Sequence, residues 1–237
     1  MRSVVVLPTY NEKDNLEEVV NAVLAQPGEF SVLVVDDASP DGTGKAADAL
    51  ACARPDRVSV LHRERKEGLG RACAAGFSRA LADGADLVFQ MDADLSHAPA
   101  DLPRLRAPLE AGTADLALGS RYAPGGGTAG WGLVRRALSR WGSFYARVLL
   151  RLPQRDLTGG FKGWTRRALQ SVNPATAASR GYSFQVEMTL RAVRAGARVV
   201  EVPIVFTERR AGRSKMSPGI ALEAAWRVPL LALRRSR

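Results

Sequence analysis

The chain has 237 residues, and its 34 lysines and arginines outnumber its 24 aspartates and glutamates, which gives a net charge of +10. Hydrophobic residues make up 46% of the chain and charged residues 24%, a composition typical of a folded globular protein rather than a disordered one. Two cysteines are too few for a disulfide scaffold, the N-terminus reads as a strand rather than a leader peptide, and no apolar run approaches the roughly 18 residues of a membrane-spanning helix. These features favour a reducing compartment and exclude the secreted and integral membrane classes.

Short apolar runs rich in β-branched residues recur along the first 120 residues, with starts about 26–29 residues apart. They cover residues 4–7, 32–35, 58–61, 87–89 and 116–118. Each interval accommodates a strand, a crossover helix and two loops, and helical stripes such as the one from Leu16 to Leu24 fill the gaps. The runs lack polar alternation, as in a parallel sheet covered on both faces. The sequence therefore predicts a doubly wound α/β unit, with its ligand site beyond the carboxyl ends of the strands.

The regular spacing ends after residue 120. The elements expected next are a glycine-rich loop at 124–127, a helix from Leu133 to Leu152, a second glycine-rich loop at 156–163, a helix around Phe184–Ala195, a strand at Arg198–Phe206, a basic loop and a final helix. No internal repeat or long linker separates these elements from the α/β unit. We therefore expect one domain in three parts, at residues 1–120, 121–216 and 217–237.

The positive charge is concentrated in two segments. Residues 121–151 contain six arginines and no acid, and residues 207–237 contain seven arginines and one lysine against two glutamates, so each segment carries +6. Because the whole chain carries +10, the remaining 175 residues carry −2. Such basic segments indicate an anionic partner, which can be nucleic acid, a membrane or an anionic substrate.

Acidic side chains follow two of the predicted strands. Asp36 and Asp37 end the second strand, and Asp92 and Asp94 follow the fourth. Carboxylates two positions apart in an extended segment lie on one side, and these hard oxygen ligands suit Mg²⁺ or Mn²⁺ with substrate phosphates completing the shell. Their place at a strand end favours this metal site over the alternative, in which one of them caps the next helix. We expect His97 to make a structural hydrogen bond rather than to bind metal.

Six short motifs follow one another along nearly the whole chain. They are PTYNE at 8–12, VVDDASPDGT at 34–43, DADLSH at 92–97, GSRY at 119–122, DLTGGF at 156–161 and a basic stretch at 209–217. As an ordered set they resemble glycosyltransferase family 2 with the GT-A fold, and most closely its polyprenyl (dolichyl) phosphate mannosyltransferases. The resemblance implies an inverting, metal-dependent enzyme that moves mannose from GDP-mannose to a polyprenyl phosphate.

The resemblance also assigns roles to individual residues. It implies a nucleotide pocket formed by Pro8, Tyr10, Glu12, Val35 and Asp37. Asp92 and Asp94 would bind Mg²⁺ or Mn²⁺ on the donor diphosphate, with Ala93 against the nucleotide. Ser96 stands where many relatives have glutamine, and its shorter hydroxyl makes it the weaker candidate for a third metal ligand.

Basic residues of this chain match family positions that contact donor or acceptor phosphates. They are Arg121, Arg135, Arg209 and Lys215. The catalytic set implied by the resemblance is Asp94, Arg121, Arg209 and Lys215. The alternative for each basic residue is an ordinary solvated charge. On these assignments, residues 1–120 bind metal and nucleotide sugar, residues 121–216 lie on the acceptor side, and residues 217–237 form a basic amphipathic helix.

The chemistry of such a transfer fits the predicted charges. A divalent metal and cationic side chains stabilise the departing diphosphate. A phosphate monoester is largely dianionic at pH 7, so it attacks the anomeric carbon without a general base. A hydroxyl acceptor would need a base, for which Asp156 and Glu187 are the candidates; without that role each is expected to order the structure around it.

The helix predicted after residue 132 has a basic arc and an apolar side. At about 100° per residue, Arg136, Arg140, Arg147 and Arg151 fall within about 60° of one another, opposite leucine, valine and aromatic residues. This pattern indicates either a membrane-surface helix or a helix whose apolar side packs on the sheet while its arginines are solvated. Residues 220–237 repeat the combination.

The sequence as a whole predicts a mannosyltransferase that is peripheral to the cytoplasmic face of an anionic membrane, with GDP-mannose and a polyprenyl phosphate as partners and no nucleic acid. A separate membrane-anchoring protein is a further conceivable partner. Two alternatives stay open: a family 2 enzyme with another donor or acceptor, such as UDP-glucose or a hydroxyl group, and a basic membrane- or nucleic-acid-binding module. A nucleotidyltransferase or a dinucleotide enzyme is not expected, because no glycine-rich phosphate loop follows the first strand.

Overall fold

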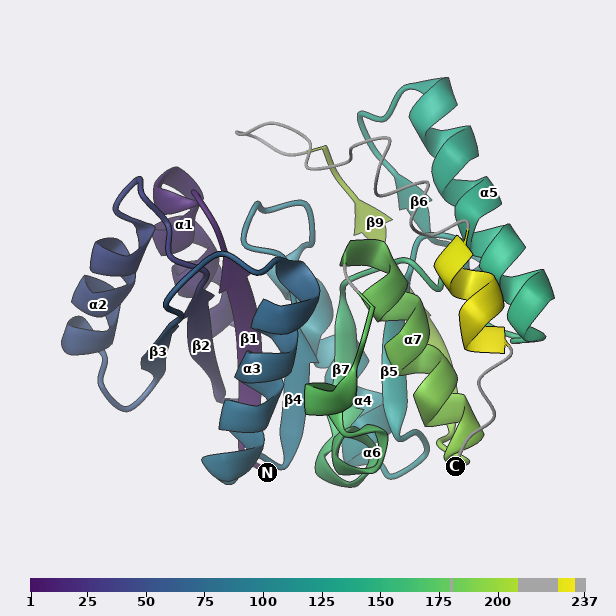
Figure 1. Ribbon diagram of the computed structural model, residues 1–237. Coiled ribbons are helices and arrows are strands. Elements are labelled where there is room, and N and C mark those ends of the chain that lie inside the picture. The colour runs from purple at the N-terminus through teal and green to yellow at the C-terminus, as the bar shows by residue number, and fades with distance from the viewer. Residues whose placement is uncertain (180, 209–225, 233–237) are drawn as a thin grey trace.

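The protein is built around one seven-stranded sheet with helices on both faces (Figure 1), and the computed structural model describes residues 1–179, 181–208 and 226–232. The strands are β1 (Ser3–Thr9), β2 (Phe30–Asp36), β3 (Val58–His62), β4 (Leu87–Gln90), β5 (Leu116–Ser120), β7 (Lys162–Thr165) and β8 (Val199–Pro203). Their order across the sheet is β3-β2-β1-β4-β7-β5-β8, and only β7 runs antiparallel to its neighbours. The predicted mainly parallel, doubly wound sheet is confirmed.

Two layers of helices cover this sheet. One face carries α1 (Lys13–Leu24), α2 (Thr43–Ala53) and α4 (Leu102–Glu110), and the other carries α3 (Leu69–Ala82), α6 (Arg166–Val172) and α7 (Gly181–Arg194). Short 3₁₀ turns, η1 (Pro99–Asp101) and η2 (Pro174–Thr176), precede α4 and follow α6. Successive strand residues serve opposite faces: Val5 and Leu7 join the first core, whereas Val4 and Val6 join the second. The continuous apolar runs thus reflect burial on both faces.

Close packing of α3 on the sheet depends on Gly76. A Cβ atom at Gly76 would overlap Val6 of β1 and lie 2.8 Å from Val35 Cγ2 of β2. Glycine at this position therefore lets α3 lie close to β1 and β2, whose carboxyl ends lead into the loops that begin at Tyr10 and Asp37.

After residue 120 the structure contains α6, which was not expected, and two of the expected elements differ. The expected loop at 156–163 ends early, because β7 begins at Lys162 and enters the sheet between β4 and β5. The expected strand at Arg198–Phe206 is divided into β8 and β9 (Val205–Phe206), and β9 pairs with β6 (Gly127–Thr128) in a separate two-stranded sheet. Pro203 has no N–H with which to continue the ladder, and the chain leaves the large sheet there.

A further layer lies outside α7. It consists of α5 (Leu133–Leu150) and a helical segment at residues 226–232, which share a third hydrophobic core with α7. Figure 1 shows α5 starting above the carboxyl ends of the strands and running down along this side of the molecule. Within the described residues, no helix is both long and apolar enough to cross a bilayer.

Candidate active site

The carboxyl ends of β1, β2 and β4 share an unusual backbone feature. Asn11, Ala38 and Leu95, which follow these three strands, have φ angles of 56°, 57° and 59°. Non-glycine residues adopt this left-handed region rarely and at some energetic cost, and such positions cluster at functional sites. Adjacent parallel strands also place their carboxyl ends at one edge of the sheet. This edge is therefore the first place to look for chemistry.

The loop after β1 is tied to the loop after β2 by hydrogen bonds. The Asn11 backbone N–H donates to Ser39 Oγ over 3.1 Å, and the buried Glu12 donates its N–H to Thr43 Oγ1 over 3.0 Å. Tyr10 remains half-buried, and the Lys66 ammonium lies 3.7 Å from the centre of its ring. Tyr10 and Glu12 thus lie at this edge, where the sequence places them.

Val35 does not line this edge through its side chain, contrary to the prediction. The Val35 side chain is fully buried beneath α3, and its carbonyl accepts a hydrogen bond from Thr9 Oγ1. Asp37 does lie at the edge, where the N–H groups of Glu67 and Gly68 donate to its carboxylate over 3.2 and 3.0 Å. Arg63 forms an ion pair with the same carboxylate. Asp37 therefore orders the loop between β3 and α3.

The segment after β4 holds the two predicted metal ligands in different surroundings. The Asp92 side chain is 29% exposed, whereas Asp94 is buried. Asp94 Oδ1 accepts hydrogen bonds from the Ser96 N–H, over 3.1 Å, and from the Ser96 hydroxyl. Ser96 thus supports Asp94 from a fully buried position. In this structure the Ser96 hydroxyl is therefore engaged by the Asp94 carboxylate.

His97 has the structural role that the sequence predicts. Its Nδ1 accepts a hydrogen bond from the Asp92 backbone N–H over 3.2 Å, and its ring lies 5.0 Å from the rings of both Phe161 and Phe206. Burial lowers the pKa of His97, although Asp92 and Asp94 oppose that shift. The neutral ring therefore fixes the backbone that carries Asp92.

Gly160 lies beside Asp92 and Gln90. A Cβ atom on Gly160 would lie 3.4 Å from Asp92 Oδ1 and 3.5 Å from Gln90 Nε2. Gln90 is buried, and its Nε2 lacks a hydrogen-bond partner among the described residues. No group of three or more His, Cys, Asp or Glu side chains comes together in the described ranges. The carboxylates of Asp92 and Asp94 offer the hard oxygen ligands that a divalent cation prefers, with substrate phosphates and water to complete its shell.

Arg121 forms a buried ion pair with Asp156. Its Nε and Nη2 each donate to the Asp156 carboxylate over 2.7 Å, and Nη2 also donates to Thr158 Oγ1 over 2.9 Å. Burial alone would raise the pKa of Asp156, but the Arg121 charge and hydrogen bonds outweigh it and lower that pKa. None of the hydrogen bonds among the described residues uses Arg121 Nη1. Two of the three guanidinium nitrogens of Arg121, Nε and Nη2, thus hold the loop at residues 156–160 in place.

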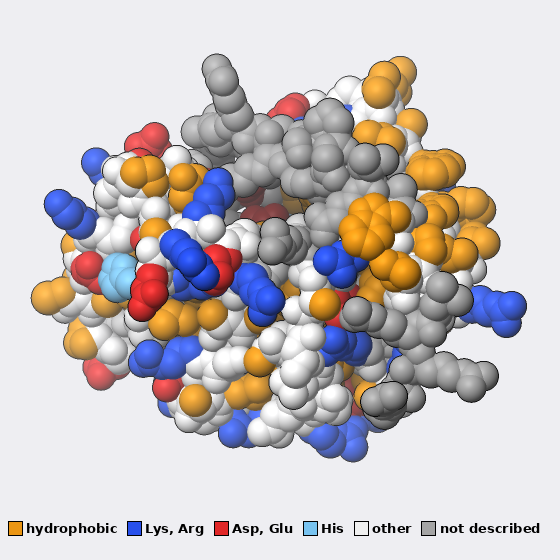
Figure 2. Space-filling model, in the orientation of Figure 1, with side chains coloured by type: hydrophobic (Ala, Val, Ile, Leu, Met, Phe, Trp, Pro, Cys, Tyr) orange, Lys and Arg blue, Asp and Glu red, His pale blue; other side chains and the backbone are white. Residues whose placement is uncertain are grey.

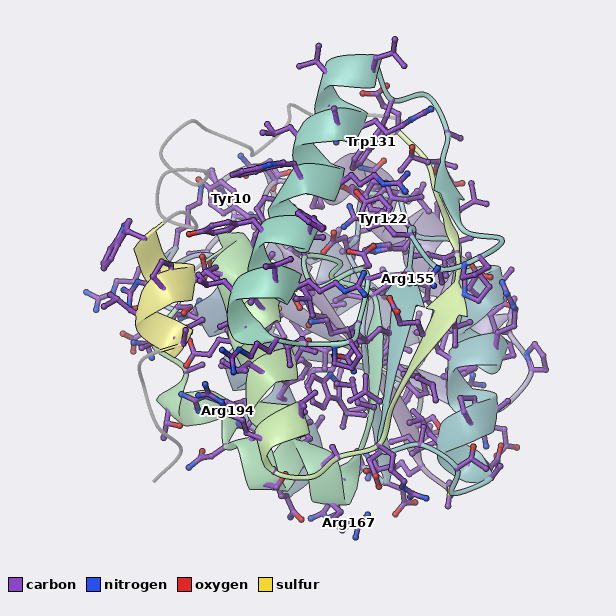
Figure 3. The ribbon with its side chains drawn as sticks, turned by 90° about the vertical axis from the view of Figure 1, so that its right-hand side faces the viewer. Tyr10, Tyr122, Trp131, Arg155, Arg167 and Arg194 are labelled. Atoms are coloured by element: carbon purple, nitrogen blue, oxygen red, sulfur yellow. The ribbon has the colours of Figure 1, made fainter. Side chains whose placement is uncertain are left out.

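Of the remaining basic candidates, Arg135 lies among the residues that the structure describes. Arg135 at the start of α5 donates from Nη1 to Glu208 Oε1 over 2.9 Å and lies 4.2 Å from the Trp131 ring centre. Figure 3 shows Trp131 and Tyr122 together beside the upper half of α5. Arg209 and Lys215 lie outside the described residues.

Comparison with known proteins identifies the family to which this chain belongs. The profile of "Glycosyl transferase family 2" matches residues 4–172. The chain belongs to glycosyltransferase family 2. It is 47% identical over 98% of its length to the polyprenol monophosphomannose synthase of Mycolicibacterium smegmatis, with 88% of that protein covered. It is 48% identical over 96% of its length to the undecaprenyl-phosphate mannosyltransferase of Micrococcus luteus, with 93% covered.

Solved structures of a more distant protein share the fold of this glycosyltransferase. Glucosyl-3-phosphoglycerate synthase from Mycobacterium tuberculosis, in complex with Mn²⁺, UDP and phosphoglyceric acid, superposes with a TM-score of 0.70 at 20% identity, covering 98% of this chain and 77% of that one. A structure of the same enzyme with Mg²⁺ and UDP gives a TM-score of 0.68 at 22% identity, covering 98% and 78%. The predicted family and its GT-A-type architecture are confirmed.

Sequence reasoning missed two buried polar residues in the central sheet of this glycosyltransferase, Lys162 and Gln90. Lys162 on β7 is fully buried and donates from Nζ to the Gln185 carbonyl over 2.8 Å and to Thr189 Oγ1 over 2.9 Å. Burial lowers the pKa of Lys162 to about 7. Gln90 lies opposite Lys162 across the β4–β7 pair. The sequence does contain one signal for them, since each is a polar residue beside apolar strand residues. Burying a polar group in a sheet is costly unless it makes specific hydrogen bonds.

Proposed function

We propose that this glycosyltransferase moves mannose from GDP-mannose to a polyprenyl phosphate with inversion at the anomeric carbon, giving polyprenyl phosphate mannose and GDP. Two curated relatives with 47% and 48% identity over nearly the whole chain support the sugar and the lipid, because their names contain both. The donor nucleotide and the metal are part of the proposal.

The hydrogen bonds and pKa shifts of the two candidate general bases, Asp156 and Glu187, support a phosphate acceptor over a hydroxyl acceptor. Asp156 is engaged by Arg121, and Glu187 accepts the Ser179 N–H over 2.9 Å and pairs with Arg191 over 2.6 Å. Burial would raise the pKa of Glu187, but these hydrogen bonds and the Arg191 charge lower it, as happens at Asp156. A carboxylate that is saturated with N–H donors and has a lowered pKa is a poor general base. A dianionic phosphate needs no base and therefore fits this site.

In this proposal, Asp92 and Asp94 hold Mg²⁺ or Mn²⁺, which stabilises the charge of the leaving diphosphate when bound. Pro8, Tyr10, Glu12 and Asp37 form the nucleotide side, together with the loop that Asp37 orders. The Ala93 side chain, which the resemblance also places there, packs in the core beneath this edge. An acceptor phosphate oxygen forms the new bond to the anomeric carbon as the bond to the GDP oxygen breaks. Because attack and departure occur on opposite faces of the sugar, the configuration inverts.

Basic side chains offset the repulsion between the two phosphates in this scheme. We assign this role to Arg121 through Nη1, to Arg135, and to Arg209 and Lys215 in the basic segment. Arg121 has a second task, since its contacts with Asp156 and Thr158 order the loop beside Asp92. The enzyme would work at the cytoplasmic face of the membrane that holds the lipid acceptor.

Transfer of labelled mannose to polyprenyl phosphate in detergent, in the presence of Mg²⁺ or Mn²⁺, tests the proposal. We expect a lipid-linked product that Asp94→Ala abolishes, while the exposed Asp48→Ala, which removes the same charge on α2, leaves its formation unchanged. Absence of product from wild-type protein with every nucleotide sugar tested would overturn the proposal.

UDP-glucose is the second candidate donor, because the solved structures that share the fold contain UDP. Melting temperatures with GDP and with UDP decide between the donors, since a ligand that binds the native state raises the Tm by mass action. A larger rise with UDP would move the assignment from GDP-mannose to UDP-glucose.

A further inference from the structure

The two-stranded sheet of β6 and β9 joins residues 92–97, which include the two candidate metal ligands, to the segment that leads into α5. Phe206 lies in β9, and its carbonyl accepts the Ala129 N–H over 2.9 Å. The next residue, Thr207, donates its N–H to the Ser96 carbonyl over 3.0 Å. Backbone hydrogen bonds therefore connect the candidate metal site, through β9, with the residues just before α5.

Aromatic rings follow the same route as these hydrogen bonds. The Phe206 ring lies 5.0 Å from the His97 ring and 5.2 Å from the Trp131 ring, with interplanar angles of 84° and 74°. Edge-to-face contacts of this kind are favourable for aromatic pairs. Phe206 and Trp131 are buried, and His97 accepts the Asp92 N–H. His97, Phe206 and Trp131 thus form a continuous row of rings that begins at Asp92, and we call this row the aromatic bridge.

Two arginines lie at the Trp131 end of the aromatic bridge. Arg135 Cζ is 4.2 Å from the centre of the Trp131 ring, and Arg121 Cζ is 5.7 Å from the same centre. Arg121 Cζ also lies 5.6 Å from the centre of the Phe206 ring. An aromatic face attracts a guanidinium but, unlike a carboxylate, has no net charge. The two rings therefore hold both guanidiniums in place without adding to the negative charge of their carboxylate partners.

The first half of α5 has few contacts that could fix Arg135. The buried residues of the helix are Ser143, Ala146 and Leu150, all in its second half. The apolar side of α5 is exposed, and Figure 2 shows hydrophobic side chains along the right-hand edge of the molecule, where Figure 1 places α5. The alternative that this apolar side packs on the sheet is wrong. We therefore expect the position of Arg135 to depend on Trp131.

We propose that Phe206 and Trp131 are positioning residues that hold Arg121 and Arg135 at a fixed place relative to Asp92. The inference rests on the proposed function, which assigns the two arginines to the acceptor phosphate and Asp92 to the metal on the donor diphosphate. Transfer requires an acceptor phosphate oxygen close to the anomeric carbon, and small displacements of reacting groups cost large factors in rate. The aromatic bridge sets the separation of the two phosphate sites before either substrate binds.

Steady-state transfer in detergent, with GDP-mannose and polyprenyl phosphate as substrates, tests the proposal. We expect Trp131→Leu and Phe206→Leu to lower kcat/KM for polyprenyl phosphate about 10- to 100-fold. Trp131→Phe keeps an aromatic face at this position and should retain kcat/KM within about threefold of wild type. The rise in Tm that GDP with Mg²⁺ produces should be the same in all three variants, because His97 still fixes the Asp92 backbone.

Phe77→Leu is the matched control for the loss of a buried ring. Phe77 lies in the core between α3 and α7, where its ring stacks on Phe184 at 6.5 Å. This variant should have a lower Tm but unchanged kcat/KM at a temperature at which it is folded. Equal losses of kcat/KM in Phe77→Leu and Phe206→Leu, or wild-type transfer by Trp131→Leu, would overturn the proposal. A smaller GDP-induced rise in Tm in Phe206→Leu would also overturn it, because the defect would then lie on the donor side.

Binding of polyprenyl phosphate without donor separates this proposal from the proposed function. Titration calorimetry in detergent should give a Kd about 10-fold weaker for Trp131→Leu than for wild type, because Arg135 loses the ring that holds it. A protein that shows this difference but transfers no mannose refutes the proposed function and leaves the aromatic bridge supported. A protein that transfers mannose, with equal Kd and kcat/KM values in wild type and Trp131→Leu, refutes the aromatic bridge alone.

Discussion

Replacement of Asp156 by asparagine tests whether its ion pair with Arg121 holds the site together. In Asp156→Asn, the buried guanidinium keeps its charge but loses the carboxylate that it now contacts twice at 2.7 Å. Removing one partner of a buried pair costs about 3–5 kcal/mol, because the other charge remains buried without compensation. We expect the free energy of unfolding, measured in urea, to fall by that amount.

The pH dependence of this loss follows from the pKa of Asp156, which is lowered in the folded protein by Arg121. A carboxyl group with a lowered folded pKa stabilises the protein fully above its unfolded pKa, about 3.9, and loses that contribution as the pH falls through the folded pKa. The difference between wild type and Asp156→Asn should therefore be constant from about pH 5 to 8 and shrink only in acid.

A double replacement provides the control. Arg121→Met combined with Asp156→Leu removes both charges and should recover most of the lost stability, since apolar residues of similar size can replace a buried pair. The double variant should still fail in transfer, because Nη1 is gone. A loss below about 1 kcal/mol in Asp156→Asn, the range of exposed ion pairs, would refute the reasoning.

Three further outcomes are expected. Gly76→Ala should lower the free energy of unfolding by about 1–3 kcal/mol, because its Cβ would press on Val6 and Val35; Gly142→Ala, where nothing lies within 4 Å, should instead stabilise the protein by up to about 1 kcal/mol in the same urea titration. Because the pKa of Lys162 is about 7 in the folded protein and 10.5 as its ordinary value, the unfolded chain binds more protons between these limits, so stability should rise with pH there, and Lys162→Met should remove the rise measured between pH 7 and 9. Chelation of divalent metal by EDTA should abolish labelled product, and Mg²⁺ or Mn²⁺ should restore it; full transfer in EDTA would contradict the metal assignment.

Much of the fold follows from the sequence because parallel strands buried on both faces are continuous apolar runs. All five runs up to residue 120 are strands β1 to β5. The short β7 was not predicted, because it contains Lys162 and Gly163 and two glycines lie just before Phe161. The position of β7 between β4 and β5 depends on pairing with strands distant in the sequence, which the local hydrophobic pattern does not predict.

The location of a candidate residue was predictable where the residue lies at the end of its own strand, as Asp92, Asp94 and Asp37 do. It was not predictable where a side chain finds a distant partner. Arg121 pairs with Asp156, 35 positions further along the chain, and no local pattern announces that contact. The sequence also did not determine which side of α5 packs against the protein. A helical wheel separates an apolar arc from a basic arc but does not say which of the two is buried.

The position of β7 has a consequence for folding during synthesis. β4 and β5 leave the ribosome first, but they are not neighbours in the sheet, and β7 must be inserted between them. About 40 residues separate the end of β5 from the start of β7, so at typical translation rates both strand edges wait roughly 2–8 s for their partner. Open strand edges attract other chains. A nascent chain halted between these strands should therefore be a target for chaperones, whereas one that has passed β7 can pair the facing edges of β4 and β5.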